Sequence, residues 1–401
     1  MQRSYYLMRE VAQRHEVSVV AFRQHAHQPD RAHFQAALDA ISAFTQVIHV
    51  SDLPEDRQIG GRGALALRSL LPGVPYTIRW GMCDDYRNAV RKAVTDLQPD
   101  VVHFDTLSLA PYLDAIGGLP AVLNHHNIES IMLLRRAEQE NNPFKRVYLW
   151  QEAKRLAAYE RLVASRFRQH LVCANLDAER LQQTVGDVPT SVVPNGVDLM
   201  YFQPAPPATE QLPNSLIFVG GLSWYPNISA IRFFLKEVWP ALTAAYPEIL
   251  FRIIGRNPPP DILAMSKRDR RIQVLGFVDD IRPLFHEAMV FVCPIFDGGG
   301  TKLKMLDAMA MGKAIVAHPV ACEGLDLTHG HHVLMATSGA DFTQQIARLL
   351  DNDAERKKLE QNSREYVSAR FSFASIGRDL SRIYVNMSSP PQSNRMRGVV
   401  G

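Results

Sequence analysis

The chain has 401 residues, of which 46% are hydrophobic and 21% charged, and its formal net charge is +3. This length exceeds one ordinary hydrophobic core and predicts two or three domains, while the small charge excludes a strongly basic nucleic-acid binder. No apolar run approaches the roughly eighteen residues of a membrane span, and the charged N-terminus does not resemble a signal peptide. Four scattered cysteines predict reduced thiols in a soluble, cytoplasmic protein.

The start of the chain is unusual for an α/β domain. Residues 4–15 have a helical pattern, and residues 17–22 then form a predicted buried strand, with no strand before the helix. In a doubly wound domain the first strand is central, and the loop after it faces the ligand crevice. Either the domain is built differently or the start is truncated. We favour a truncated start, which would expose two neighbouring sheet edges and weaken the N-terminal domain. Residues 54–75, rich in Gly, Pro and Arg, are expected to form a mobile excursion.

Strands and helices alternate in both halves of the chain, which is typical of parallel α/β sheets. We predict an α/β fold with an N-terminal Rossmann-like domain over residues 1–195 and a second one over residues 214–371. Residues 196–213, which include a proline-rich stretch, read as a hinge linker. The remaining segments are a C-terminal helix that returns towards the first domain over 372–387 and a disordered tail over 388–401.

A glycine-rich turn in the second half of the chain has the features of an anion-binding site. A predicted buried strand over residues 290–294 is followed by three glycines at 298–300, by Thr301, Lys302 and Lys304, and by a helix over about 303–311. Glycines let backbone N–H groups approach a ligand, and a helix N-terminus carries partial positive charge. The residues alone predict a phosphate site, with an ordinary strand–helix connection as the alternative.

Two histidines follow the predicted strand at residues 121–124. Side chains at the carboxyl end of a parallel strand lie where such sheets bind ligands. Since His125 and His126 are adjacent, we expect only one to face the crevice; the alternative is that one of them caps a helix.

Residues 131–170 are helical and carry nine Lys or Arg against four acids, with interleaved aromatic residues. They predict contact with an anionic membrane surface or, alternatively, a solvated helical face.

Several common enzyme motifs are absent from the sequence. No Gly-x-Gly-x-x-Gly turn stands in the right setting for a dinucleotide, and residues 298–304 lack the ending of a P-loop. A hydrolase elbow of the form Gly-x-Ser-x-Gly is also missing.

An ordered set of motifs resembles the retaining, nucleotide-sugar-dependent glycosyltransferases of the GT-B fold, family four, and most of all the bacterial exopolysaccharide-associated branch. The motifs are VVHFDT (101–106), VLNHHNIES (122–130), VPNGVD (193–198), FVGGLSWYPN (218–227), IIGRNP (253–258), LGFVDDIRPLF (275–285) and GGGTKLKMLDAMAMGKAIV (298–316) with ACEGL (321–325). The resemblance implies two Rossmann-like domains that face each other across a cleft.

The resemblance also implies roles for individual residues. The donor diphosphate is expected near a set of turn and helix residues: Gly220, Gly221, Gly299, Gly300, Thr301, Lys302 and Lys304. Arg256 in IIGRNP is a further donor contact, and Phe277 and Val278 would flank the nucleobase. Asp307 stands where the family normally has a glutamate that binds the ribose, so its reach is shorter by one methylene. His126 is the implied crevice histidine that contacts the sugar.

The implied reaction transfers a sugar, with retention, to a glycan or lipid-linked acceptor at the inner face of a membrane. Lysines would stabilise the departing diphosphate, so no metal and no cofactor are expected, and no nucleic acid takes part. Two alternatives remain at this stage. One is a relative that binds a nucleotide-sugar without transferring it, supported by the unusual start and Asp307. The other is an epimerase of the same architecture, which would need acid–base residues that the motifs do not supply.

Overall fold

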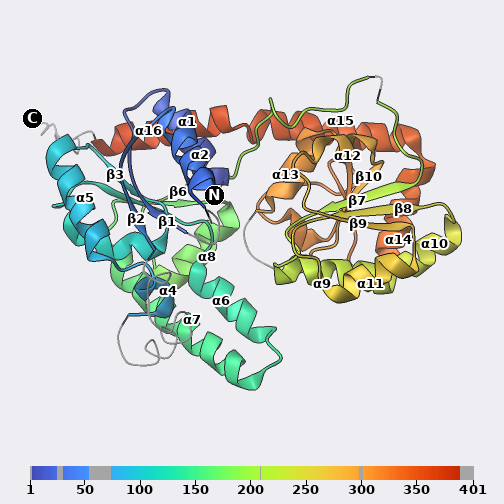
Figure 1. Ribbon diagram of the computed structural model, residues 1–401, viewed down its shortest axis with the longest axis horizontal. Helices are drawn as coiled ribbons and strands as arrows, with labels where there is room; N and C mark the ends of the chain where they lie inside the picture. The colour runs from blue at the N-terminus through green and yellow to red at the C-terminus, as the bar shows by residue number, and fades with distance from the viewer. Residues whose placement is uncertain (1, 25–29, 54–73, 208, 298–300, 389–401) are drawn as a thin grey trace, which may run out of the picture. The chain divides into compact units, whose positions relative to one another are not determined.

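The computed structural model describes residues 2–24, 30–53, 74–207, 209–297 and 301–388. The chain divides into two compact units (Figure 1). One unit contains Met1–Val193 together with Ile376–Gly401, and the other contains Pro194–Ser375. The predicted excursion at 54–75 lies almost wholly outside the described residues, as does the predicted disordered tail beyond residue 388.

The strands of the first unit are all parallel and form two sheets. The strands are β1 (Ser18–Arg23), β2 (Gln46–Asp52), β3 (Val102–Phe104), β4 (Ala121–Asn124), β5 (Gln169–Val172) and β6 (Thr190–Val192). β1 pairs with β2, and the other four pair in the order β3-β4-β5-β6. Within the described residues β1 and β3 do not pair with each other, so these strands form two separate sheets.

Helices cover the strands of the first unit. They are α1 (Gln2–Ala12), α2 (Arg31–Ser42), α4 (Tyr76–Arg79), α5 (Asp84–Leu97), the 3₁₀ segment η2 (Leu107–Ala115), α6 (Glu129–Glu138), α7 (Pro143–Ala164), α8 (Asn175–Val185) and α16 (Phe373–Ser388). α16 packs closely on α1, since a Cβ atom on Gly377 would lie 2.3 Å from Cβ of Glu10. The region predicted as helical over 131–170 contains two helices, α6 and α7, and the second begins where Asn142 caps it with Pro143 at its first position.

The second unit has a single six-stranded parallel sheet in the order β12-β11-β10-β7-β8-β9. Its strands are β7 (Ser215–Val219), β8 (Leu250–Ile254), β9 (Ile272–Gly276), β10 (Val290–Cys293), β11 (Ala314–Ala317) and β12 (Leu334–Met335). The chain builds outward from β7 through β8 to β9 and then crosses to β10 on the other side. The carboxyl ends of β7 and β10 therefore mark the topological switch point, where such sheets bind ligands.

Helices cover this sheet as well (Figure 1). They are α9 (Tyr225–Phe233), the π-helical turn η3 (Phe234–Val238), α10 (Trp239–Ala245), α11 (Pro260–Arg268), α12 (Arg282–Glu287), α13 (Leu303–Ala310), the 3₁₀ turn η4 (Pro319–Cys322), α14 (Gly339–Asp351) and α15 (Asp353–Arg370). The four residues of β10 and the four of β11 are all buried, as expected for central parallel strands. Val197 and Phe202, from the segment predicted as a linker, are buried in the core of this unit.

The α/β class and the two parallel-sheet domains predicted from the sequence are confirmed. Among the described helices, none is both long enough and apolar enough to cross a membrane. All four cysteines are free thiols, and three of them are buried.

Candidate functional site

The first group of predicted residues lies at the switch point of the second unit. Gly220 and Gly221 follow β7 directly, and α13 begins at Leu303 after the turn that follows β10. Since β7 and β10 are paired neighbours, their carboxyl ends bring the two turns to the same edge of the sheet. Sequence segments far apart in the chain thus form one site.

Lys304 connects these two turns. Its Nζ donates a hydrogen bond of 2.7 Å to Oδ1 of Asn227 and lies 4.5 Å from the centre of the Phe218 ring. Nδ2 of Asn227 in turn donates to the carbonyl oxygen of Gly221 at 2.8 Å. A Cβ atom on Gly220 would lie 2.3 Å from the Lys304 Nζ, so only glycine leaves room for the ammonium. Although Asn227 belongs to a motif quoted above, the sequence assigns it no role; the structure shows that it holds the lysine.

Burial changes the ionisation of Lys304 and Asp307, which lie one helical turn apart on α13. Burial lowers the pKa of the Lys304 ammonium to about 8. Burial raises the pKa of the Asp307 carboxyl to about 7, although the charge of Lys304 opposes that increase. Both groups therefore titrate close to neutral pH, which is common at binding and catalytic sites.

The turn before α13 contains further polar groups. Lys302 is the N-cap residue of α13, and the Oγ1 atom of Thr301 is buried with no hydrogen-bond partner among the described residues. Oδ2 of Asp297 is likewise buried and unpaired in that part of the chain. Gly299 and Gly300, predicted to contact the diphosphate, lie outside the described residues.

The remaining predicted donor residues follow the next two strands at the same sheet edge. Arg256 comes just after β8, and its guanidinium lies 3.9 Å from the ring centre of Phe277, just after β9. Phe277 is 56% exposed, so its ring is a platform on the surface rather than part of the core. Val278 is partly buried against the core of the unit.

The first unit carries a cluster of polar side chains at the carboxyl ends of β3 and β4. His126 follows β4, and its Nε2 lies 3.2 Å from Oδ1 of Asp105, which follows β3. Asn124 Nδ2 and Ser4 Oγ also donate to the Asp105 carboxylate, at 2.9 and 2.7 Å. Nε2 of His103 faces the same carboxylate at 3.8 Å. From the sequence we assigned no role to Asp105, although its place in VVHFDT at a strand end was a usable signal.

His125 differs from its neighbour, as expected for adjacent side chains in one loop. It is 4% exposed, whereas the His126 side chain is 32% exposed. His170 Nε2 lies 3.0 Å from the carbonyl oxygen of Ala164, which can only accept, so Nε2 carries the proton. His170 Nδ1 therefore accepts from Nε2 of His125 at 2.9 Å, and both imidazoles are neutral. Burial lowers the pKa of both histidines, that of His125 to about 3.

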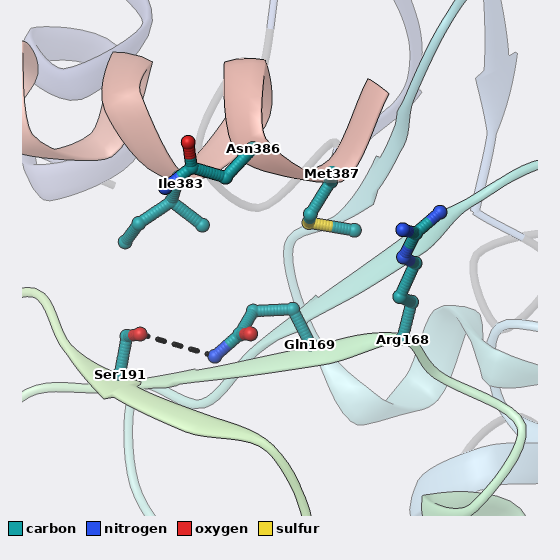
Figure 2. A pocket seen from close by; sticks show the side chains of 6 residues that line it. All are labelled: Arg168, Gln169, Ser191, Ile383, Asn386 and Met387. Carbon is teal, nitrogen blue, oxygen red and sulfur yellow. Dashed lines mark hydrogen bonds between the residues drawn. The ribbon is translucent and has the colours of Figure 1, made fainter. Parts of the chain in front are cut away.

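A small cavity of about 230 Å³ lies between α16 and the sheet of the first unit (Figure 2). It is lined by Arg168, Gln169, Ser191, Ile383, Asn386 and Met387. Gln169 begins β5, so the cavity is at the amino end of that strand, whereas His126 follows the carboxyl end of β4. The Gln169 amide already donates to Oγ of Ser191 at 3.1 Å. The cavity is therefore separate from the candidate site.

No group of three or more His, Cys, Asp or Glu side chains within the described ranges is arranged to hold a metal ion.

Two parallel α/β units, one with polar turns gathered at its topological switch point, are the architecture of the GT-B glycosyltransferases. Comparisons with known families agree with this assignment. Residues 2–201 match the family described as Glycosyltransferase Family 4, and residues 213–352 match the family described as Glycosyl transferases group 1. The chain thus belongs to the group 1/family 4 glycosyltransferases of the GT-B fold.

Solved structures with low sequence identity share the fold. One is a sucrose-phosphate synthase from Thermosynechococcus elongatus, 15% identical with a TM-score of 0.65, covering 93% of this chain and 99% of that one. Another is the Anabaena protein HepE in complex with UDP, 14% identical with a TM-score of 0.64, covering 93% and 100% of the two chains.

One curated relative is similar to part of this chain. It is described as an uncharacterized 44.6 kDa protein in the cps region of Klebsiella pneumoniae and is 23% identical over 258 residues. The match covers 62% of this chain and 64% of the length of that relative.

Proposed function

We propose that this protein transfers a sugar from a nucleotide-sugar donor to a glycan or lipid-linked acceptor, with retention of anomeric configuration, during exopolysaccharide or cell-surface glycan synthesis. The observation that carries this proposal is the Lys304 ammonium beneath Gly220 at the switch point of the second unit. Solved relatives of the same fold bind UDP and UDP-glucose, which supports a nucleotide-sugar donor. The relative from a cps region supports a role in polysaccharide synthesis.

Charge stabilisation at the diphosphate is the main chemical task of the second unit. As the bond to the sugar breaks, negative charge grows on the departing nucleoside diphosphate. The Lys304 ammonium, the side chain of Lys302 and the N-terminus of α13 would stabilise that charge. A preorganised cation needs no rearrangement during the reaction, and we therefore propose a transfer that uses neither a metal nor a cofactor.

The rest of the donor would extend along the same sheet edge. The exposed ring of Phe277, with Arg256 stacked against it, offers a flat surface for a nucleobase, beside Val278. Asp307 would accept hydrogen bonds from the ribose hydroxyls, directly or through a water that compensates for its shorter side chain. Gly221, Gly299, Gly300 and Thr301 complete the proposed diphosphate site.

His126 is the proposed contact to the transferred sugar from the first unit. It is partly exposed and stands at the carboxyl end of β4, with its Nε2 atom 3.2 Å from Oδ1 of Asp105. In the same-face route that we propose for retention, no protein nucleophile is needed.

The tip of the α6–α7 hairpin, which we define as Leu134, Phe144, Val147 and Trp150, is the proposed contact with an anionic membrane. Three of these apolar side chains are strongly exposed, with Phe144 at 86%, Val147 at 62% and Trp150 at 47%. Basic residues accompany them, and Lys154 Nζ lies 3.6 Å from the centre of the Trp150 ring. Exposed aromatic residues beside cations are typical of surfaces that enter a lipid interface. We therefore propose a cytoplasmic protein that acts at the inner face of the membrane.

A donor-binding and transfer experiment tests the proposed function. We would screen a panel of nucleotide-sugars by thermal shift, because a ligand that binds the native state raises its unfolding temperature. The best donor, radiolabelled in its sugar, is then incubated with a lipid-linked acceptor extract. We expect transfer that Lys304→Ala lowers at least about a hundredfold, while Lys236→Ala, which changes an exposed lysine, leaves it intact. Saturable donor binding without any turnover would instead identify a non-catalytic binding protein.

A further inference from the structure

His318 follows β11 at the carboxyl edge of the six-stranded sheet, one strand beyond the turn of the proposed diphosphate site. Its backbone N–H donates to the carbonyl oxygen of Cys293, the last residue of β10, at 3.0 Å. Burial raises the pKa of the Cys293 thiol, and the charges of Lys304 and Lys302 oppose that increase. Because such interactions weaken with distance, both ammonium groups are near this cysteine. His318 and the two lysines are therefore neighbours of the same strand end.

One nitrogen of the His318 ring is already bound to the backbone. Its Nδ1 atom accepts a hydrogen bond of 3.2 Å from the N–H of Val320, which makes His318 the N-cap residue of η4. A backbone N–H can only donate, so Nδ1 carries no proton and Nε2 carries the proton of the neutral ring. Burial lowers the pKa of this imidazole, although the charge of Glu323 opposes the decrease, so the ring is mainly neutral at pH 7. The side chain thus presents a neutral N–H donor at Nε2.

The Nε2–H of His318 is available to a ligand. It forms no hydrogen bond with any residue that the structure describes, and the atom is not buried. The ring of Phe296 lies beside it, with the two ring centres 6.5 Å apart and the planes at 76°. Phe296 is 42% exposed and also packs against Phe233, at 5.9 Å between ring centres. An exposed aromatic ring beside one polar donor suits a sugar, which has apolar C–H faces and a rim of oxygens.

The strand order places His318 beyond the proposed diphosphate site. Along the carboxyl edge the strands follow one another as β9, β8, β7, β10 and β11. The proposed nucleobase surface follows β9 and β8, and the proposed diphosphate site follows β7 and β10. Since neighbouring strands are about 4.8 Å apart, β11 is one such step further in the same direction. In a nucleotide-sugar the sugar is bonded to the end of the diphosphate that is remote from the nucleoside, and that end would face β11.

We propose that His318 is a further donor-binding residue, whose Nε2–H donates to an oxygen of the transferred sugar while the ring of Phe296 packs against one face of that sugar. This inference deepens the proposed function and rests on it, because it requires a nucleotide-sugar in the second unit. It also distinguishes two tasks at the sheet edge. Lys304 binds the diphosphate, which every donor of one nucleotide shares, whereas His318 binds the part in which those donors differ.

Two substitutions separate the two hydrogen bonds of His318. His318→Asn keeps an acceptor oxygen that can cap η4, but it has no atom that reaches the place of Nε2. His318→Gln carries an N–H close to that place. A control is His331→Asn, which makes the same change at an exposed histidine of this unit, before the amino end of β12.

Calorimetric titration tests the sugar contact. UDP-, GDP- and dTDP-linked hexoses are titrated into the wild type, and the tightest binder is compared with its own nucleoside diphosphate. We expect His318→Asn to weaken binding of the nucleotide-sugar about tenfold, as for one lost hydrogen bond, and to leave binding of the nucleoside diphosphate unchanged. His318→Gln should restore part of the loss, and His331→Asn should alter neither affinity. An equal loss for both ligands, or no loss for either, would overturn the proposal.

Nitrogen NMR of protein labelled with ¹⁵N-histidine observes the donor atom in the wild type at pH 7.5. Loss of signals in either variant identifies His318. We expect a protonated Nε2 and a bare Nδ1 in the free protein, and a shift of the Nε2 signal with the nucleotide-sugar that its nucleoside diphosphate does not cause. A bare Nε2, or an Nε2 signal unchanged by a nucleotide-sugar that binds, would refute the contact and leave the proposed function intact. A wild type that binds none of the nucleotide-sugars would refute both.

Discussion

The Nζ atom of Lys304 lies 2.3 Å from the point that a Cβ atom on Gly220 would occupy. A side chain at position 220 would therefore overlap with the Lys304 ammonium, although the two residues belong to different turns. Asn227 secures the arrangement, since it accepts from the lysine and donates to the carbonyl of Gly221. The glycine thus determines where the positive charge of the proposed diphosphate site is held.

Alanine substitutions at Gly220 and Gly221 should differ in their effect on protein stability, because only position 220 contacts Lys304. Gly220→Ala is expected to displace Lys304, lower the thermal midpoint of the ligand-free protein and weaken UDP binding at least about tenfold. At Gly221 a new Cβ atom meets nothing within 4 Å, so Gly221→Ala should keep the midpoint of the ligand-free protein. Thermal unfolding and calorimetric titration with UDP provide the measurements. Equal effects of the two variants on ligand-free stability would contradict the packing argument.

The affinity for UDP should pass through a maximum with pH, falling on an acidic limb and on a basic limb. The Lys304 pKa of about 8 means that its charge is lost as the pH rises above 8, which weakens diphosphate binding. The Asp307 pKa of about 7 means that its carboxylate is protonated as the pH falls below 7, which weakens ribose binding. We expect an affinity maximum between about pH 7 and 8, measured by titration at half-unit steps. Asp307→Asn should abolish the acidic limb and Lys304→Met the basic limb, and a flat profile in the wild type would refute both assignments.

The buried pair of His125 and His170 should make the first unit sensitive to acid. Both imidazoles have a pKa below the unfolded value, so the unfolded chain binds more protons and stability falls as the pH drops below about 6.5. The loss should approach about 1.4 kcal/mol per pH unit for each proton, down to about pH 3 for His125.

Denaturant unfolding between pH 7.5 and 5 measures this loss. His125→Gln should have a shallower dependence on pH, because it removes one of the two groups. His33→Gln, at a side chain that is 66% exposed, is the matched control and should follow the wild type. Identical slopes for all three proteins would show that the pair does not govern acid stability.

The hairpin tip should control attachment to lipid. We expect the protein to float with vesicles that contain phosphatidylglycerol and to float less with pure phosphatidylcholine. Replacing Phe144 and Trp150 by serine should remove most of the binding. Leu162→Ser changes a leucine that is 71% exposed at the other end of α7 and should have little effect. Absence of binding to either vesicle at any salt concentration would rule out the membrane contact.

Local patterns explain how much of the fold could be predicted. Buried runs such as residues 290–294 and 216–219 identify central parallel strands, because both faces of such strands are covered. The break between α6 and α7 could not be placed from the sequence, since it depends on a cap at Asn142 that periodicity does not show.

In the candidate site, too, residues with a local sequence signature could be predicted, and residues whose partners are distant in the chain could not. Gly220, Lys304 and Asp307 could be selected from motifs, because a glycine turn before a helix N-terminus has its own chemistry. Asn227 and Asp105 received no role, because their partners are distant in sequence. Gly299 and Gly300 stay predictions, since they lie outside the described residues.

The sequence by itself determined the alternation of strands and helices and the family, and it predicted an anion-binding turn, because each depends on residues that are close in the chain. Only the tertiary structure decided that Lys304 fits beneath Gly220, since that contact requires β10 to lie beside β7 after the chain has crossed the sheet. It also decided that Asp105 lies beside His126. Asp105 reaches that ring because β3 and β4 are neighbours, and strand order is a property of the whole fold.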